Sequence, residues 1–317
     1  MAAVDGAKWA PLIAADLNLP LAGVNAVIEL LLAGNTVPFI ARYRKEKTGA
    51  LDEVQIATIQ ERHAYVVEME DRRKTILESI ESQGKLTEEL KAKILKANTK
   101  SQLEDLYLPY KPKRRTRAMI ARERGLEPLA QAVLDPSLRK GSPEEMAAAF
   151  VDPEKEVADV AAALQGAKDI MAELISETPE VRASLRDTMS KEGVLASVQM
   201  DPTKQERTKF EQYYQHSEPI SKAPSHRYLA MRRGEREGVL RLELQVEDSR
   251  MLGIVEDKAQ IRGSGPWELL HKESARESWR RLLQPSLETD VRTEAKLNAD
   301  REAVEIFAEN LKNLILA

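Results

Sequence analysis

Positive charge is concentrated between residues 111 and 124, which read KPKRRTRAMIARER. Cations outnumber acids there by seven to one, Glu123 being the acid; they are Lys111, Lys113, Arg114, Arg115, Arg117, Arg122 and Arg124. Such side chains can bind the phosphates of a nucleic acid, because each contact releases a condensed counterion. They can equally cover helix surfaces and pair with carboxylates, since the chain has 52 Asp and Glu residues. The sequence leaves both roles open and favours the structural one.

A second group of cations occupies residues 42–47. It contains Arg42, Tyr43, Arg44, Lys45 and Lys47. Guanidinium groups can hold a phosphate or a carboxylate through two parallel hydrogen bonds. The same groups can lock the turn by pairing with Glu46, Asp52 or Glu53, and we favour this structural role. A third group, within residues 225–236, starts at Ser225, a natural helix N-cap, and is interpreted as architecture.

Residues of the kinds that enzymes use are not grouped in this sequence. The absence of cysteine excludes disulfides, thiol nucleophiles and zinc sites with sulfur ligands. A Gly-rich turn closed by Lys-Ser or Lys-Thr, which a P-loop needs, does not occur. The histidines at 63, 216, 226 and 271 are far apart and are interpreted as surface or capping residues. We therefore predict that the chain is not an enzyme and holds no cofactor and no metal.

The overall composition narrows the class of protein further. The formal net charge is −4, so a positive field over the whole surface is absent and any site for polyanions must be local. Aromatic residues make up 4%, which argues against an extensive surface of stacked bases. No run approaches the about 20 apolar residues of a membrane span. We expect a cytoplasmic protein that does not enter membranes.

Helical periodicity dominates the chain, and helices would position the cationic groups. Residues from Leu51 to Gln83 include no Pro or Gly, which predicts one helix of about 30 residues. Thr87 and Ser101 are the expected N-caps of the next two helices. Two short helices around Gly125 then give the outline of a helix-turn-helix. Three more helices are predicted where Ser142, Asp152 and Thr178 each precede a proline.

Strands are predicted at residues 194–200 and 240–247, the second from its alternation of apolar and charged residues. Helices return from Trp267 to Leu283 and from Pro285 onward. The predicted fold is mainly α, a multi-helical, elongated region with a helix-turn-helix-like subdomain and a small β element. We expect three parts: residues 1–110 with the long helix, residues 111–193 as the helix-turn-helix-like subdomain, and residues 194–317, whose helices pack back on the N-terminal region.

Three segments go beyond generic patterning. They read TVPFIARYRKEKTGALDE at residues 36–53, LEDLYLPYKPKRRTRAMIARERGLEPLA at residues 103–130, and PSHRYLAMRRGEREGVL at residues 224–240. Together they resemble the Tex family of bacterial transcription accessory factors, over essentially the whole chain. Ala50 departs from the family pattern, in which a second glycine usually follows Gly49. A turn residue with positive φ would be slightly strained at this alanine.

The resemblance implies a helical, non-enzymatic scaffold in a factor that associates with nucleic acid, RNA in particular, and with RNA polymerase or other transcription proteins. It also implies that an RNase H-like domain, a helix-hairpin-helix pair and an OB-fold domain would follow in a full-length member, and that nucleic-acid binding depends chiefly on the OB-fold domain. We therefore expect this chain to be an N-terminal fragment. Two alternatives stay open: a direct nucleic-acid-binding module that uses residues 111–124 together with residues 42–47, and part of a nuclease.

Overall fold

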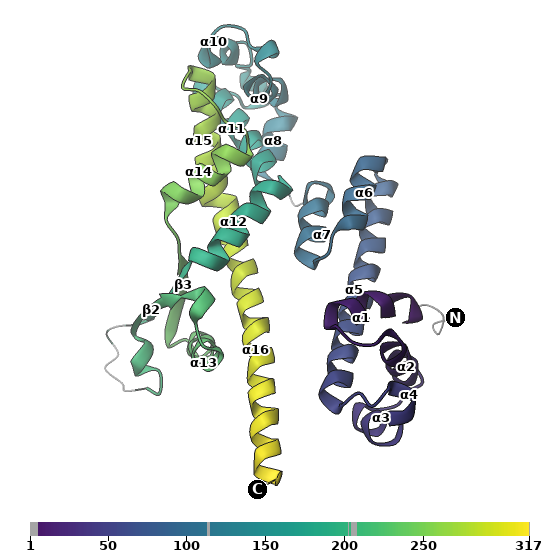
Figure 1. Ribbon diagram of the computed structural model, residues 1–317. Helices are drawn as coiled ribbons and strands as arrows, with labels where there is room; N and C mark the ends of the chain where they lie inside the picture. Colours follow the sequence, from purple (N-terminus) through teal and green to yellow (C-terminus); the bar gives the residue numbers. More distant parts are fainter. Residues whose placement is uncertain (1–5, 113–114, 202, 204–207, 317) are drawn as a thin grey trace. The chain divides into compact units, whose positions relative to one another are not determined.

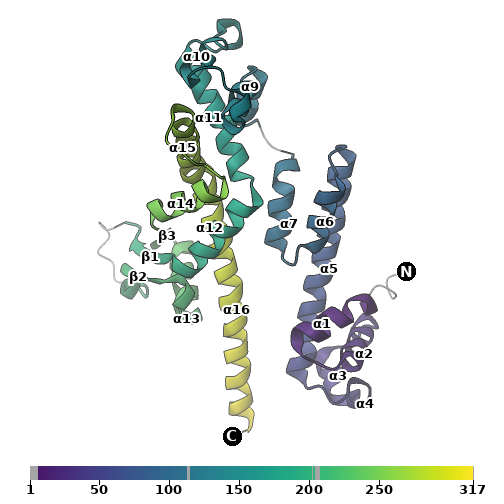
Figure 2. The same cartoon turned by 45° about the horizontal axis from the view of Figure 1, so that its top comes forward.

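The computed structural model describes residues 6–112, 115–201, 203 and 208–316, and it divides the chain into two compact units, Met1–Tyr110 and Lys111–Ala317 (Figures 1 and 2). The fold is mainly α with a small β element, as predicted. Within the described residues, no helix is both long and apolar enough to cross a lipid bilayer.

The first unit is all helical in its described part. Its elements are η1 (Gly6–Trp9), α1 (Ala10–Leu17), α2 (Leu21–Leu32), α3 (Val37–Tyr43), α4 (Lys45–Thr48), α5 (Glu53–Ser82), α6 (Glu88–Lys96), α7 (Lys100–Tyr107) and η2 (Leu108–Tyr110). The long helix α5 confirms the prediction for residues 51–83, and it begins with a capping box in which Asp52 accepts from the Gln55 amide. Helices α1–α4 cover its first half and α6 and α7 its second half (Figure 1).

The second unit contains the remaining helices and one sheet. Its helices are α8 (Arg117–Glu123), α9 (Glu127–Leu134), η3 (Pro136–Leu138), α10 (Pro143–Ala148), η4 (Pro153–Lys155), α11 (Val160–Ser176), α12 (Pro179–Glu192), η5 (Glu211–Tyr213), η6 (Ile220–Lys222), α13 (Ser225–Arg236), α14 (Asp248–Lys258), α15 (Pro266–Ser278), the π-helical turn η7 (Trp279–Leu283) and α16 (Gln284–Leu316). Its strands are β1 (Val194–Gln199), β2 (Gln215–Pro219) and β3 (Leu240–Gln245).

Two hydrophobic cores stabilise this unit. One lies among α8–α11 and α15, at the end of the unit where these helices gather (Figure 1). The other brings the sheet together with α12, α13, α14 and the first half of α16 around the fully buried Trp279. The strands run antiparallel in the order β2-β1-β3, and Leu195 of β1 lies opposite Leu244 of β3. The two predicted strands are therefore neighbours in one sheet.

Several predicted boundaries are wrong. Thr99, not Ser101, caps α7, since its side chain accepts from the Gln102 amide. Asp152 caps only the short η4, and α11 begins later, with Asp159 as its cap. The strand β2 was not predicted, because its sequence QHSEP is polar and no apolar alternation marks it. Ser225 is the first residue of α13 and not its N-cap.

The predicted break before Pro285 does not occur, because α15, η7 and α16 follow one another as continuous helix. A proline inside an α-helix removes one backbone hydrogen bond and crowds the carbonyl four residues earlier. The π-helical turn Trp279–Leu283 ends two positions before Pro285 and contains that carbonyl, at Arg281. The wider turn therefore accommodates the proline without ending the helix.

Candidate nucleic-acid interface

Helix α8 contains most of the described part of the basic segment. The Thr116 side chain caps it by accepting from the Met119 amide, with 3.1 Å between Oγ1 and N. Gly125, at φ +81°, turns the chain into α9. On α11, a Cβ at Gly166 would lie 2.2 Å from Cδ1 of Leu126, so the glycine lets α11 approach the turn closely. Two short helices joined at Gly125 thus pack on α11.

Arg122 points into the unit and not toward solvent. Its Nη1 donates to Oε1 of Glu173 on α11 over 2.8 Å, and its side chain is 29% exposed. Glu173 is buried and also accepts from Oγ1 of Thr116, again over 2.8 Å. Both ends of α8 are therefore tied to one buried carboxylate, and Arg122 is a structural residue.

The other cations of the segment lie closer to solvent. Arg115 pairs with Glu123 over 2.8 Å, and Arg124 pairs with Glu156 over 2.5 Å. Lys111 and Arg117 are exposed. Burial raises the pKa of the Asp169 carboxyl. The positive charges of Arg281 and Arg117 oppose that rise. Lys113 and Arg114 lie outside the described residues.

The second helix of this pair, α9, buries its apolar face in the core. Leu129 and Val133 are fully buried there. Its first residue, Glu127, lies 3.7 Å from Nε of Arg122. An acidic start and a buried face are poor properties for a helix that would read a DNA groove.

The second cationic group lies on α3, on α4 and between them, at the end of the first unit where α5 begins (Figure 2). Arg42 and Lys45 are exposed, and Tyr43 keeps 61% of its surface. Arg44 donates from Nη1 to the Tyr43 carbonyl over 3.0 Å and stacks over the Phe39 ring at 4.9 Å. Among the ion pairs of the described residues, none joins this group to Glu46, Asp52 or Glu53, so the predicted locking by acids is not seen.

The cations of the third group have a structural role, as predicted. Arg227 pairs with Glu218 over 2.7 Å, and Arg233 pairs with Glu237 over 2.8 Å. Glu235 of α13 accepts from Arg292 of α16 over 2.6 Å. The Arg227 pair holds α13 against the sheet, the Arg292 pair holds it against α16, and the Arg233 pair lies within the end of α13.

Arg73 and His271 are among the buried charged or titratable residues that sequence reasoning missed. Arg73 of α5 donates to the carbonyls of Ile94 and Ala97 over 3.2 and 2.7 Å, so it satisfies the C-terminal end of α6. His271 of α15 was interpreted as a surface or capping residue, but it is buried, and burial lowers its pKa to about 4. Their burial depends on partners distant in sequence, and no local pattern signals it.

The charges of Arg139 and Glu268 act on this histidine, Arg139 lowering its pKa and Glu268 raising it. Arg139 donates to Glu268 over 2.6 Å and to the carbonyls of Ala132 and Val133 at the end of α9. The hydrogen bond from Arg139 holds the pKa of Glu268 below its usual range. These contacts of Arg139 join α9 to α15.

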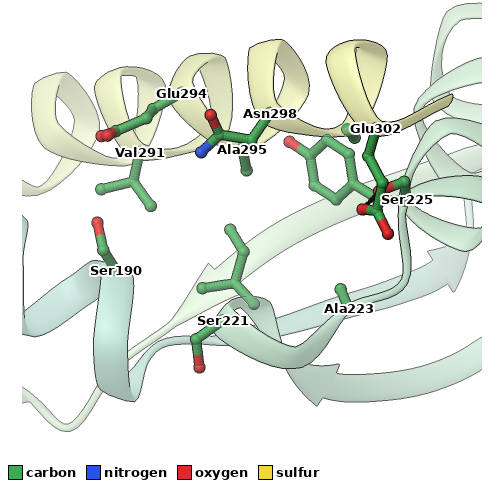
Figure 3. A pocket seen from close by; sticks show the side chains of 12 residues that line it. Ser190, Ser221, Ala223, Ser225, Val291, Glu294, Ala295, Asn298 and Glu302 are labelled. Atoms are coloured by element: carbon green, nitrogen blue, oxygen red, sulfur yellow. Dashed lines mark hydrogen bonds between the residues drawn. The ribbon is translucent and has the colours of Figure 1, made fainter. Parts of the chain in front are cut away.

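A small hollow lies between α16 and the segment from α12 to α13 (Figure 3). It has a volume of about 250 Å³. Ser225 donates to Glu302 at one end, and Figure 3 shows Asn298 between Glu294 and Glu302 along α16. In the part of the chain that the structure describes, no three His, Cys, Asp or Glu side chains are close enough together to hold a metal ion.

Comparison with known proteins places these elements in a family. Residues 138–307 match the model of the Tex central region, and residues 7–81 match the model of the Tex-like protein N-terminal domain. The chain is 43% identical over 316 residues to Protein YhgF of Escherichia coli, a match that covers 96% of this chain and 40% of that protein.

Two further relatives carry descriptive names. The chain is 40% identical over 311 residues to the Transcriptional accessory protein Tex of Neisseria gonorrhoeae, covering 95% of this chain and 40% of that protein. It is 27% identical over 305 residues to the human S1 RNA-binding domain-containing protein 1, covering 92% of this chain and 30% of that protein. The chain thus spans about two fifths of the length of these bacterial relatives.

Proposed function

The chain belongs to the Tex family, and we propose that it is a non-catalytic helical scaffold within a transcription accessory protein. In this proposal the factor works in the cytoplasm with nucleic acid, RNA above all, and contacts RNA polymerase or another transcription protein. The name of the gonococcal relative supports the link to transcription, and the name of the human relative supports the link to RNA.

The observation that best supports the scaffold proposal is an ion pair that a cation of the basic segment forms within the second unit. Arg122, the most enclosed of its described cations, pairs with the buried Glu173. Because withdrawing Arg122 would leave this buried carboxylate without its cation, Arg122 is a poor candidate for a phosphate contact. The pair stabilises the position of α8 on α11.

The second candidate is direct nucleic-acid binding by residues 111–124. The exposed positions of Lys111, Arg115 and Arg117 favour it, since a surface pair such as Arg115 with Glu123 exchanges its partner at little cost. Charge reversal at Arg115 and Arg117 distinguishes the candidates. Under the scaffold proposal, this variant keeps the affinity of the parent chain for RNA within about two-fold, whereas direct binding through the segment predicts a steep, salt-dependent loss.

Partner binding and turnover are tested on the same purified chain. We expect immobilised chain to retain purified bacterial RNA polymerase, and we expect labelled RNA to stay intact when the chain is incubated with it and Mg²⁺. Metal-dependent cleavage that co-purifies with the chain would contradict the non-catalytic assignment. Failure to retain RNA polymerase would remove this partner from the proposal.

A further inference from the structure

The cations of α3 and α4 differ from most others in the chain by their lack of carboxylate partners. We call Arg42, Tyr43, Arg44, Lys45 and Lys47 the α3–α4 patch. Among the described residues, no ion pair includes any of its four cations, whereas Arg115, Arg122 and Arg124 of the basic segment all have one. Residues 42–47 carry four cations and the single acid Glu46, a net charge of +3 in a chain whose net charge is −4. The patch is a local positive surface that is not neutralised internally.

The patch also presents an aromatic ring. Tyr43 is 61% exposed, and its ring centroid lies 5.3 Å from that of Phe39 at an interplanar angle of 44°. The Arg44 guanidinium lies 4.9 Å from the Phe39 ring on the same helix end. Among the described aromatic residues, the other one with a comparably large exposure is Phe307, which lies among apolar residues of α16. Tyr43 is thus an exposed ring set between cations.

The backbone beneath the patch is well anchored. Ile40 and Thr48 are buried, and the Thr48 hydroxyl lies 3.3 Å from the Arg44 carbonyl to which it donates. Gly49, at φ +69°, ends α4, and the nearby Asp52 is engaged in the capping box of α5. No ion pair among the described residues joins Asp52 to the cations of the patch, and its Oδ1 accepts from the Gln55 amide. A patch held in place before binding loses less entropy when a ligand arrives.

We propose that the α3–α4 patch binds single-stranded nucleic acid, with Tyr43 stacking on a base and Arg42, Lys45 and Lys47 contacting the adjacent phosphates. Every base offers a π face, so a ring between cations suits single strands of any sequence. An acidic protein segment would pair with the cations but would not require the exposed ring. A duplex keeps its bases stacked inside the helix, where Tyr43 cannot stack on them. The proposal does not rest on the scaffold role, which is argued from the contacts of α8 and α11.

The test is fluorescence anisotropy of the whole chain with a labelled single-stranded RNA oligonucleotide at about 50 and about 200 mM salt. Replacing Arg42 and Lys45 by Glu (R42E/K45E) is expected to weaken binding at least about ten-fold and to reduce the log–log salt slope by about 1.4, since each phosphate contact on a single strand contributes about 0.7. Tyr43→Ala is expected to weaken binding about ten-fold with the salt slope unchanged, and Tyr43→Phe is expected to retain binding.

The matched control is K91E/K96E on α6, at the other end of the first unit. Lys91 and Lys96 are exposed, and this variant changes the net charge by the same amount. Its affinity for RNA is expected to stay within about two-fold of that of the parent chain, because salt screens the effect of charges that lie far from the bound RNA. Melting followed by circular dichroism verifies that each variant is folded.

Three outcomes would overturn the proposal. The first is unchanged RNA binding by folded R42E/K45E, and the second is an equal loss in K91E/K96E, which would show a net-charge effect only. The third is unchanged binding by Tyr43→Ala together with equally tight binding of polyglutamate, which would make the patch a surface for acidic proteins. Single-stranded RNA binding that exceeds duplex DNA and polyglutamate binding, and that needs both Tyr43 and the cations, supports it.

Discussion

Replacing Arg122 by Met is expected to destabilise the second unit although the change lies in a segment rich in cations. The substitution keeps the apolar stem and removes the charge that Glu173 accepts over 2.8 Å. Breaking a fully buried ion pair costs about 3–5 kcal/mol. Arg122 is 29% exposed and Glu173 keeps the Thr116 hydroxyl, so we expect a loss of about 2 kcal/mol in the free energy of unfolding.

Urea denaturation followed by tryptophan fluorescence measures this loss, because Trp267 and Trp279 are both buried in the second unit. The melting temperature is expected to fall by about 4–8 °C, at about 2–4 °C per kcal/mol for a unit of this size. Arg115→Met is the control, since its pair with Glu123 is exposed and such pairs contribute less than about 1 kcal/mol. Equal, small effects in both variants would refute the assignment of Arg122 as a structural anchor.

Three other substitutions test separate parts of the fold. Ala50 has a φ of +62°, so Ala50→Gly is expected to raise the stability of the first unit by about 0.5–1 kcal/mol in chemical denaturation; a loss would show that the turn is unstrained. Burial lowers the pKa of His271 to about 4 from an ordinary 6.5, so the unfolded chain binds the proton first as the pH falls. Stability is therefore expected to decrease from pH 6.5 to pH 4, by about 2 kcal/mol, and His271→Gln should remove this part of the pH dependence of urea midpoints. Arg73→Met removes the guanidinium donor from the carbonyls of Ile94 and Ala97 at the end of α6, and faster amide hydrogen exchange confined to α6 and its contacts is the expected result; unchanged exchange would contradict it.

Local sequence signals specified much of the helical architecture. The long stretch without Pro or Gly predicted α5. Ser142 was predicted as a cap, and in the structure it begins α10 through a capping box with Glu145. Capping was predicted less well where two suitable residues lie close together, as with Thr99 and Ser101, because the choice depends on which turn the neighbouring helices stabilise. The strand β2 could not be predicted, since its pairing with β1 and not an apolar face holds it in the sheet.

The candidate site shows where sequence reasoning fails. Charge density marked residues 111–124, but density does not reveal that Arg122 meets a buried glutamate 51 positions later. For residues 42–47, nearby acids suggested internal pairing, but Asp52 is used to cap α5. The availability of a cation depends on tertiary neighbours, which the charge density of a sequence segment does not reveal.

The most direct test of this account compares charge reversal in the two cationic groups in one assay. The R42E/K45E and R115E/R117E variants of the whole chain are titrated against the same single-stranded RNA, with the parent chain alongside. The account predicts at least about ten-fold weaker binding for the first variant and a change within about two-fold for the second. The opposite pattern, in folded variants, would show that the basic segment is the contact surface and would contradict the account.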